Sequence, residues 1–112
     1  MRKQYFLNAN IIDTHNSLNE VGGLIIGDNG LVEAIGKKVN KNNIPSREKV
    51  IDLKGKYIFP GIVDMRVFVG EPGYEYKENF RTLSNAALSG GVTSVVTMPN
   101  TDPIIDNVSI VD

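Results

Sequence analysis

The stretch over residues 59–100 constrains the fold of this chain most strongly. An apolar run over residues 62–69 predicts a strand, and the β-branched run over residues 92–98 predicts another. Between them, residues 75–89 carry apolar side chains three and four positions apart, which predicts a helix. Strand, helix and strand in this order form a βαβ unit with parallel strands. Because parallel sheets are covered on both faces, the pattern predicts an α/β protein whose sheet needs further strands.

The predicted helix over residues 75–89 has a single apolar face. Tyr76, Phe80, Leu83 and Ala87 follow one another at helical spacing, so we interpret them as packing residues. The pair Gly90-Gly91 predicts the end of the helix, because glycine accepts the left-handed conformation common at helix C-termini.

The first half of the chain predicts a small antiparallel β unit. Residues 2–12, 21–26, 31–35 and 50–53 are short apolar runs with strand composition. Asp28-Asn29-Gly30 separates two of them and predicts a hairpin, because Asn and Gly tolerate positive φ. The lysine-rich segment over residues 37–48 predicts an exposed loop with little order.

Composition excludes several functional classes. The 112 residues carry 12 basic and 13 acidic side chains and no cysteine, which argues against nucleic acid partners, disulfides and thiolate metal sites. Apolar runs stay far short of the roughly 20 residues that span a bilayer, and the N-terminus lacks a signal-peptide pattern, so we expect a cytoplasmic protein without a membrane partner. His15, the only histidine, and the lysines Lys37, Lys38 and Lys41 are interpreted as solvated; an anion site at the lysines is the alternative.

The strand over residues 62–69 carries polar residues on one of its faces. That face carries every second residue of the strand, including Asp64, Arg66 and Phe68, whereas the other face is wholly apolar. Polar residues near the carboxyl end of a buried parallel strand are where barrel enzymes build active sites. Because a buried charge needs an opposite partner, we also predict a structural ion pair between Asp64 and Arg66.

Two motifs carry a resemblance to a known family. Residues 60–73 read Pro-Gly-Ile-Val-Asp-Met-Arg-Val-Phe-Val-Gly-Glu-Pro-Gly, and residues 98–103 read Met-Pro-Asn-Thr-Asp-Pro. They resemble the dihydroorotases of the amidohydrolase superfamily. The resemblance implies the N-terminal part of a (β/α)8 TIM barrel preceded by strands of a small β-sandwich domain. Residues 1–56 are then the sandwich part and residues 57–112 the first, incomplete βαβ unit.

The resemblance also implies site residues. The family pattern Asp-x-His-x-His places two zinc-ligating histidines at the positions of Arg66 and Phe68. Arginine offers only donors and phenylalanine offers no lone pair, so we expect no zinc or other cofactor on this strand. Gly70 stands where the family has an arginine that grips the substrate carboxylate. Asp64 and Asn100 match the family; Asn100 is a substrate-binding candidate, with a turn role as the alternative.

Three functions follow from the resemblance and its departures. The first is a non-catalytic dihydroorotase-like protein of pyrimidine biosynthesis, a structural scaffold for aspartate transcarbamoylase or for self-association. The second is an active metal-dependent hydrolase of a small cyclic amide with a remodelled site. The third is a small-anion binding module that uses Arg66. A complete barrel takes about 250 residues, so we expect this sequence to be a fragment of the full fold.

Overall fold

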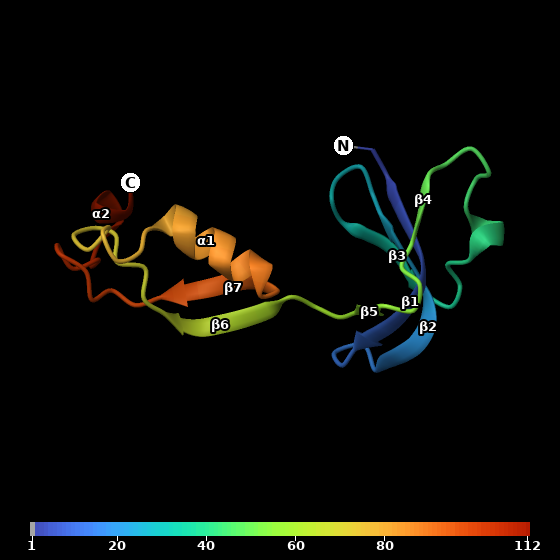
Figure 1. The fold of residues 1–112 in the computed structure, drawn as a ribbon, viewed down its shortest axis with the longest axis horizontal. Helices are drawn as coiled ribbons and strands as arrows, with labels where there is room; N and C mark the ends of the chain where they lie inside the picture. Colours follow the sequence, from blue (N-terminus) through green and yellow to red (C-terminus); the bar gives the residue numbers. More distant parts are fainter. Residues whose placement is uncertain (1) are drawn as a thin grey trace. The chain divides into compact units, whose positions relative to one another are not determined.

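The computed structural model describes residues 2–112 as a mixed α/β structure made mostly of strands, without a closed barrel among those residues. The chain divides into two compact units, Met1–Pro60 and Gly61–Asp112 (Figure 1). Neither α-helix of the described residues is long and apolar enough to cross a membrane. The elements in chain order are β1 (Gln4–Asp13), β2 (Leu18–Ile26), β3 (Val32–Gly36), the 3-10 helix η1 (Lys41–Asn43), β4 (Val50–Asp52), β5 (Tyr57–Ile58), β6 (Ile62–Val67), α1 (Phe80–Ser89), β7 (Val92–Thr97) and α2 (Val108–Val111).

The first unit is a five-stranded sheet arranged around β1. The strand order is β3-β2-β1-β4. β5 also pairs with β1, at residues 10 and 11, which follow the residues that pair with β4. β1, β2 and β3 are antiparallel, as the sequence predicts, but β4 and β5 run parallel to β1. The prediction of a purely antiparallel unit is therefore wrong. The segment between β3 and β4 is long enough to return the chain to the start of β1, as a parallel pairing requires.

The β2–β3 hairpin confirms the predicted turn. The Gly30 amide donates to the Gly27 carbonyl at 3.0 Å, and the Gly27 amide donates to the Leu31 carbonyl at 2.8 Å. Gly30 has φ of 78°, in the left-handed region that glycine favours. The Asn29 side chain accepts from the Leu31 amide at 3.0 Å, so Asn29 and Gly30 both stabilise the turn locally.

The segment over residues 37–48 is more ordered than its lysines predict. Val39 is 2% exposed and Ile44 8% exposed, and both join the core of the first unit with Ala9 and Ile11 of β1. Between them, η1 is capped by Asn40, whose side chain accepts from the Asn42 amide at 2.9 Å. The expectation of an exposed loop holds for most of this segment, but it is wrong for Val39 and Ile44, which are buried.

A polar connection holds β4 beside β1. The Asn8 side chain donates to the Asp52 carboxylate at 3.0 Å, and the Lys54 amide donates to the same oxygen at 2.8 Å. These hydrogen bonds, chiefly that from Asn8, lower the pKa of Asp52 below its ordinary value. Asn8 itself lies in the left-handed region at φ 59°, where the β1–β2 register shifts. The irregularity in β1 thus provides the donor that fixes the end of β4.

The second unit pairs β6 and β7 in parallel, with α1 between them in sequence and packed against β7. The helix begins at Phe80, later than the predicted Glu75, because Asn79 caps it in a reciprocal pair of hydrogen bonds with Thr82. Tyr76 consequently lies outside the helix and is 80% exposed, so its predicted packing role is wrong. At the other end Gly91 has φ of 81°, which confirms the predicted glycine stop.

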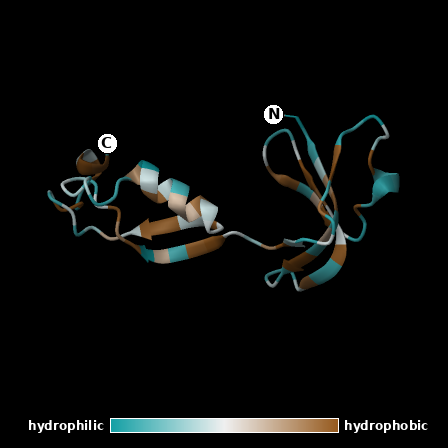
Figure 2. Ribbon diagram, viewed as in Figure 1, coloured by the Kyte–Doolittle hydropathy of each residue, from teal (hydrophilic) through white to brown (hydrophobic). Residues whose placement is uncertain are grey.

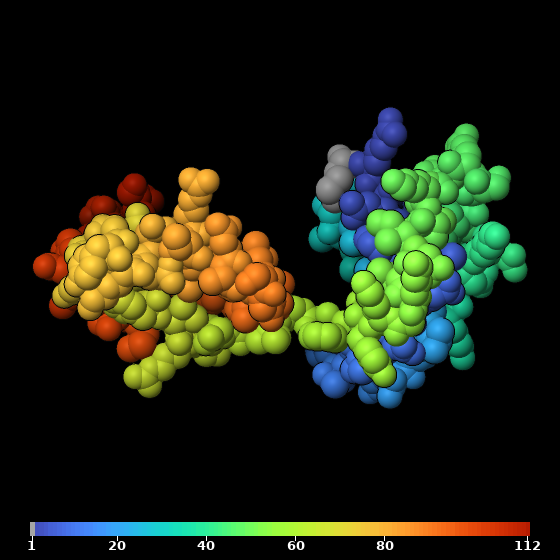
Figure 3. Space-filling view, viewed as in Figure 1, coloured from blue at the N-terminus to red at the C-terminus, as the bar shows by residue number. Residues whose placement is uncertain are grey.

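Much apolar surface of the second unit is exposed. Val69 is its one buried apolar side chain among the described residues, while Val63 and Met65 of β6 are 55% and 69% exposed. The hydropathy view shows brown, apolar colouring over much of β7 and brown interrupted by teal along β6 (Figure 2). In the space-filling view the orange atoms of α1 form part of the surface of the second unit (Figure 3). A two-stranded sheet with this much apolar surface leaves a large area for further packing.

Candidate functional site

The predicted site residues gather where β6 and β7 end. The two strands are parallel, with Val67 in register with Thr97, and the Met98 amide donates to the Val67 carbonyl at 2.8 Å. We call this end of the sheet, residues 64–73 and 97–103, the carboxyl edge. Ligands of open parallel sheets bind beyond the carboxyl ends of the strands. The fold therefore brings the residues that the sequence singled out to the expected end of the sheet.

Asp64 and Arg66 do not form the predicted ion pair. The Asp64 carboxylate instead accepts a hydrogen bond from the Arg66 backbone amide at 3.0 Å. The Arg66 Nε donates to the Met98 Sδ at 3.3 Å, across to the residue that follows β7. Within residues 2–112, the salt bridges of 4.0 Å or less join other residues. Both side chains are exposed, so burial does not force them to pair, and the prediction is wrong.

The side chains of the carboxyl edge do not fit a zinc ion. Arg66 carries a guanidinium, and the Phe68 ring packs on Tyr74 with centroids 6.2 Å apart and planes tilted by 52°. Neither side chain has a lone pair for a metal. Within the part of the chain that the structure describes, no cluster of three His, Cys, Asp or Glu side chains could surround a metal ion. The family's zinc therefore has no ligand set among these residues.

Gly70 has a backbone that leaves no room for a side chain. Its φ is 74°, and its carbonyl accepts from the Tyr74 amide at 2.6 Å, which closes a tight turn. A Cβ atom at this position would lie 2.7 Å from the Glu78 carbonyl oxygen and 3.0 Å from that of Tyr74. The arginine that the resemblance places here would require this turn to open. The local backbone therefore excludes an arginine side chain at position 70.

Two acidic residues, Glu71 and Glu75, stabilise the local structure around the Glu71-Pro72-Gly73 segment. The Glu71 carboxylate accepts from the Phe80 amide at 2.9 Å, at the N-terminus of α1, where negative charge is favourable. The Glu75 carboxylate accepts from the Gly73 amide at 3.0 Å, and this hydrogen bond lowers the pKa of Glu75. The sequence does not predict these contacts, although the spacing of Asn79 and Thr82 is a recognisable capping signal.

The loop that follows β7 packs against the Glu71-Pro72-Gly73 segment. The Asp102 amide donates to the Pro72 carbonyl at 3.1 Å, and a Cβ atom on Gly73 would lie 2.3 Å from the Asp102 carbonyl oxygen. Thr101 is 5% exposed and donates through its hydroxyl to the Pro103 carbonyl at 2.8 Å. Asn100 lies in the same loop and is exposed. Its predicted role in substrate binding stays a prediction.

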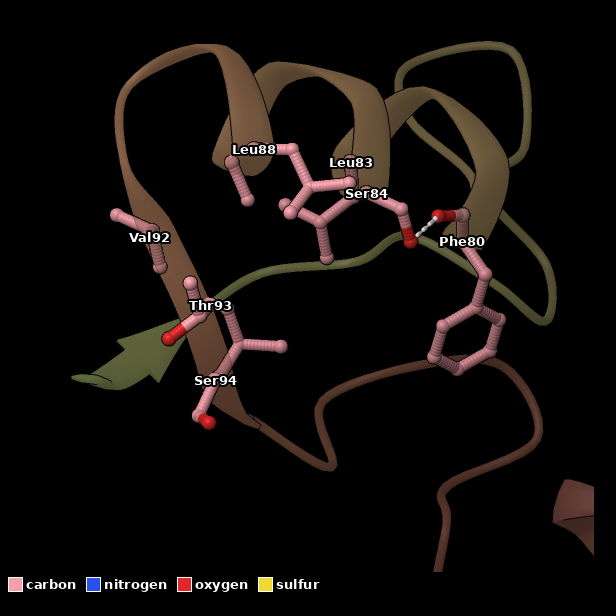
Figure 4. A pocket seen from close by; sticks show the side chains of 9 residues that line it. Phe80, Leu83, Ser84, Leu88, Val92, Thr93 and Ser94 are labelled. Carbon is pink, nitrogen blue, oxygen red and sulfur yellow. Dashed lines mark hydrogen bonds between the residues drawn. The ribbon is translucent and has the colours of Figure 1, made fainter. Parts of the chain in front are cut away.

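A groove of about 200 Å³ lies between α1 and β7 of the second unit (Figure 4). Apolar side chains, among them Phe80, Leu83 and Leu88, contribute much of its lining. The Ser84 hydroxyl lies at its margin and donates to the Phe80 carbonyl at 2.6 Å, so this polar group is already satisfied within the helix. The groove offers apolar packing surface and does not include the residues of the carboxyl edge.

Comparison of the chain with known proteins identifies its family. Residues 55–111, about half of the chain, match the family model described as dihydro-orotase-like. The chain is 45% identical over 102 residues to the dihydroorotase of Chlorobaculum tepidum, and this alignment covers 91% of the chain and 23% of that protein. It is 42% identical over 100 residues to the dihydroorotase of Pelobacter propionicus, which covers 89% of the chain and 23% of that relative.

The dihydroorotase of Carboxydothermus hydrogenoformans is 41% identical over 87 residues, 78% of the chain and 19% of the relative. The chain thus spans less than a quarter of the length of these curated relatives. The family match includes β6, α1 and β7, the elements that build the carboxyl edge. The chain belongs to the dihydro-orotase-like family.

Proposed function

We propose that this chain is part of a non-catalytic dihydroorotase-like protein of pyrimidine biosynthesis. The observation that carries the proposal is the chemistry at residues 66 and 68, where a guanidinium and a phenyl ring replace the two imidazoles of the family pattern. Gly70, whose backbone excludes the carboxylate-binding arginine, supports the same conclusion. Three positions that serve metal and substrate in the family therefore carry residues unable to perform those tasks.

We propose further that β6, α1 and β7 are the first βαβ unit of a TIM barrel, within residues 57–112. The parallel pairing of β6 and β7 and the exposed apolar residues along them support this assignment. Residues 1–56 then belong to a small β-sandwich domain. In such a barrel, the carboxyl edge lies at the end where active sites are found.

The proposed role is structural. The family resemblance suggests association with aspartate transcarbamoylase or with a second copy of the protein. The exposed apolar surface of the second unit is compatible with such packing. Co-purification of the protein with aspartate transcarbamoylase, and a sedimentation measurement of the protein alone, distinguish these two assemblies.

The experiment that tests the proposal combines metal analysis with an activity assay. We expect the purified protein to contain no stoichiometric zinc and to leave dihydroorotate unchanged. Stoichiometric zinc together with turnover would establish the competing function, a hydrolase of a cyclic amide with a remodelled site. In that case Asn100→Ala should abolish turnover, because Asn100 is the remaining substrate-binding position of the family pattern.

A further inference from the structure

We propose that the first unit carries a binding site for the phosphate group of a small soluble molecule. The site is a cavity of about 410 Å³ at the end of the sheet where β1 and β4 begin. We call it the basic cavity, after the four basic residues that line it: Arg2, Lys3, Arg47 and Lys49. Its size is typical of cavities that bind small molecules. These residues belong to the first unit and those of the carboxyl edge to the second, so the inference does not depend on the proposed function.

The topology of the first unit brings the four basic residues together. Two of them directly precede β1, and the other two lie within residues 47–49, directly before β4. β1 and β4 are parallel neighbours, with Tyr5 in register with Val50, so both strands begin at the same end of the sheet (Figure 1). Two short basic segments that are far apart in the sequence therefore meet at one cavity.

Hydrogen bonding and burial fix the backbone that carries these side chains. Ile44 is 8% exposed, and the Glu48 amide donates to the Pro45 carbonyl at 2.9 Å, which closes a turn that includes Arg47. Tyr5, which is also 8% exposed, forms part of the cavity wall. Ligand binding therefore requires ordering of the charged side chains but little ordering of the backbone, which lowers its entropic cost.

The basic cavity has an excess of positive charge. Lys3 donates to the Glu33 carboxylate at 2.8 Å, whereas the Arg47 Nε lies 4.0 Å from the Glu48 carboxylate. Within residues 2–112, Arg2 and Lys49 form no ion pair of 4.0 Å or less. Like charges around one cavity repel one another, and an anion between them removes that repulsion. A ligand with two or more negative charges matches this excess.

The ligand class follows from the donors and from the carboxylates nearby. Arginine binds phosphate oxygens through two parallel hydrogen bonds, and lysine binds them as a point charge. Glu48 lines the cavity, Glu33 binds one of its lysines, and Asp28 lines a neighbouring cavity that shares both arginines. These carboxylates would repel an extended polyanion such as a nucleic acid or an anionic membrane. A small phosphate compound can instead contact the basic side chains within the cavity.

The test uses pyrophosphate as the probe and amide NMR of the full 112-residue chain as the readout. We expect saturable shifts for residues 3–5 and 47–51, and far smaller shifts with sodium chloride at the same ionic strength. Arg47→Gln and Lys49→Gln should each weaken pyrophosphate binding about threefold or more, because each removes one charge from the cavity. Lys41→Gln is the matched control: it removes an exposed charge from the same unit, at another cavity, and should leave the affinity unchanged.

Asp28→Asn provides a variant that keeps every basic residue in place. Because it removes a carboxylate next to the shared arginines, it should tighten pyrophosphate binding about twofold. Shifts that chloride reproduces, or equal losses of affinity in Lys49→Gln and Lys41→Gln, would overturn the proposal. Tighter binding to vesicles of phosphatidylcholine and phosphatidic acid than to pyrophosphate would also overturn it, because the ligand would then be a membrane surface.

Discussion

Replacing Gly70 by alanine should lower the free energy of unfolding of the second unit. The loss has two parts, a conformational cost and a steric cost. A non-glycine residue in the left-handed region costs about 1–2 kcal/mol. The new Cβ would also lie 2.7 Å from the Glu78 carbonyl oxygen and 3.0 Å from that of Tyr74, a steric conflict of about 1–3 kcal/mol. We therefore expect a total loss of about 2–5 kcal/mol.

Gly91 offers the matched control for this substitution. Its φ of 81° is close to the 74° of Gly70, but a Cβ atom at Gly91 would meet nothing within 4 Å. Gly91→Ala should therefore show the conformational cost alone, about 1–2 kcal/mol. Amide hydrogen exchange in α1 and at Tyr74, whose amide donates to the Gly70 carbonyl, measures both variants in the same unit. Equal losses for the two variants would refute the claim that the backbone around Gly70 excludes a side chain.

Three further predictions concern hydrogen bonds. Glu71→Ala should lower protection of the Phe80 amide and destabilise α1 by about 0.5–2 kcal/mol, measured by hydrogen exchange; unchanged protection would contradict the capping role. Asp52 has a lowered pKa in the folded chain, so its contribution to stability is present above its ordinary pKa of 3.8 and is lost as the pH falls through the lowered value. Asn8→Ala should raise that pKa in an NMR titration, and an unshifted titration would exclude the Asn8 contact. Thr101→Val should cost about 0.5–1.5 kcal/mol in chemical unfolding because the Pro103 carbonyl loses the hydrogen bond from the buried Thr101 hydroxyl, whereas a neutral result would show that water replaces it.

The sequence predicts best those features that local chemistry determines. Asp28-Asn29-Gly30 forms its hairpin because the positive φ at Gly30 and the Asn29 side-chain bond both lie within the turn. The end of α1 is equally local, since Gly91 adopts the left-handed conformation that glycine favours. The alternation of strand and helix over residues 62–98 likewise reflects periodicity within each element.

The features that the sequence does not predict depend on contacts between distant residues. The helix start moves to Phe80 because Asn79 and Glu71 satisfy its first amides, which apolar periodicity does not detect. Val39 and Ile44 are buried although they lie in a segment whose composition is that of a solvated loop. The parallel pairing of β4 with β1 likewise joins distant residues, and the hydrogen bond between Asn8 and Asp52, which are 44 residues apart, accompanies it.

At the carboxyl edge, residue types and geometry provide different information. The replacement of the family histidines by Arg66 and Phe68 is visible in the sequence and already excludes these side chains as metal ligands. The Asp64–Arg66 pair fails because its prediction assumed burial, whereas both residues are exposed in this structure. The turn at Gly70 could not be derived from residue types, because its tight contacts come from carbonyl groups four and eight residues further along the chain.

Zinc titration followed by amide NMR tests the central claim most directly. The comparison is between this chain and its Arg66→His/Phe68→His double variant, which restores two nitrogen ligands on one face of β6. We predict that zinc leaves the amides of residues 64–70 of the natural chain unshifted, while the double variant shows saturable shifts there. Saturable zinc-dependent shifts centred on Arg66 and Phe68 of the natural chain would contradict the account.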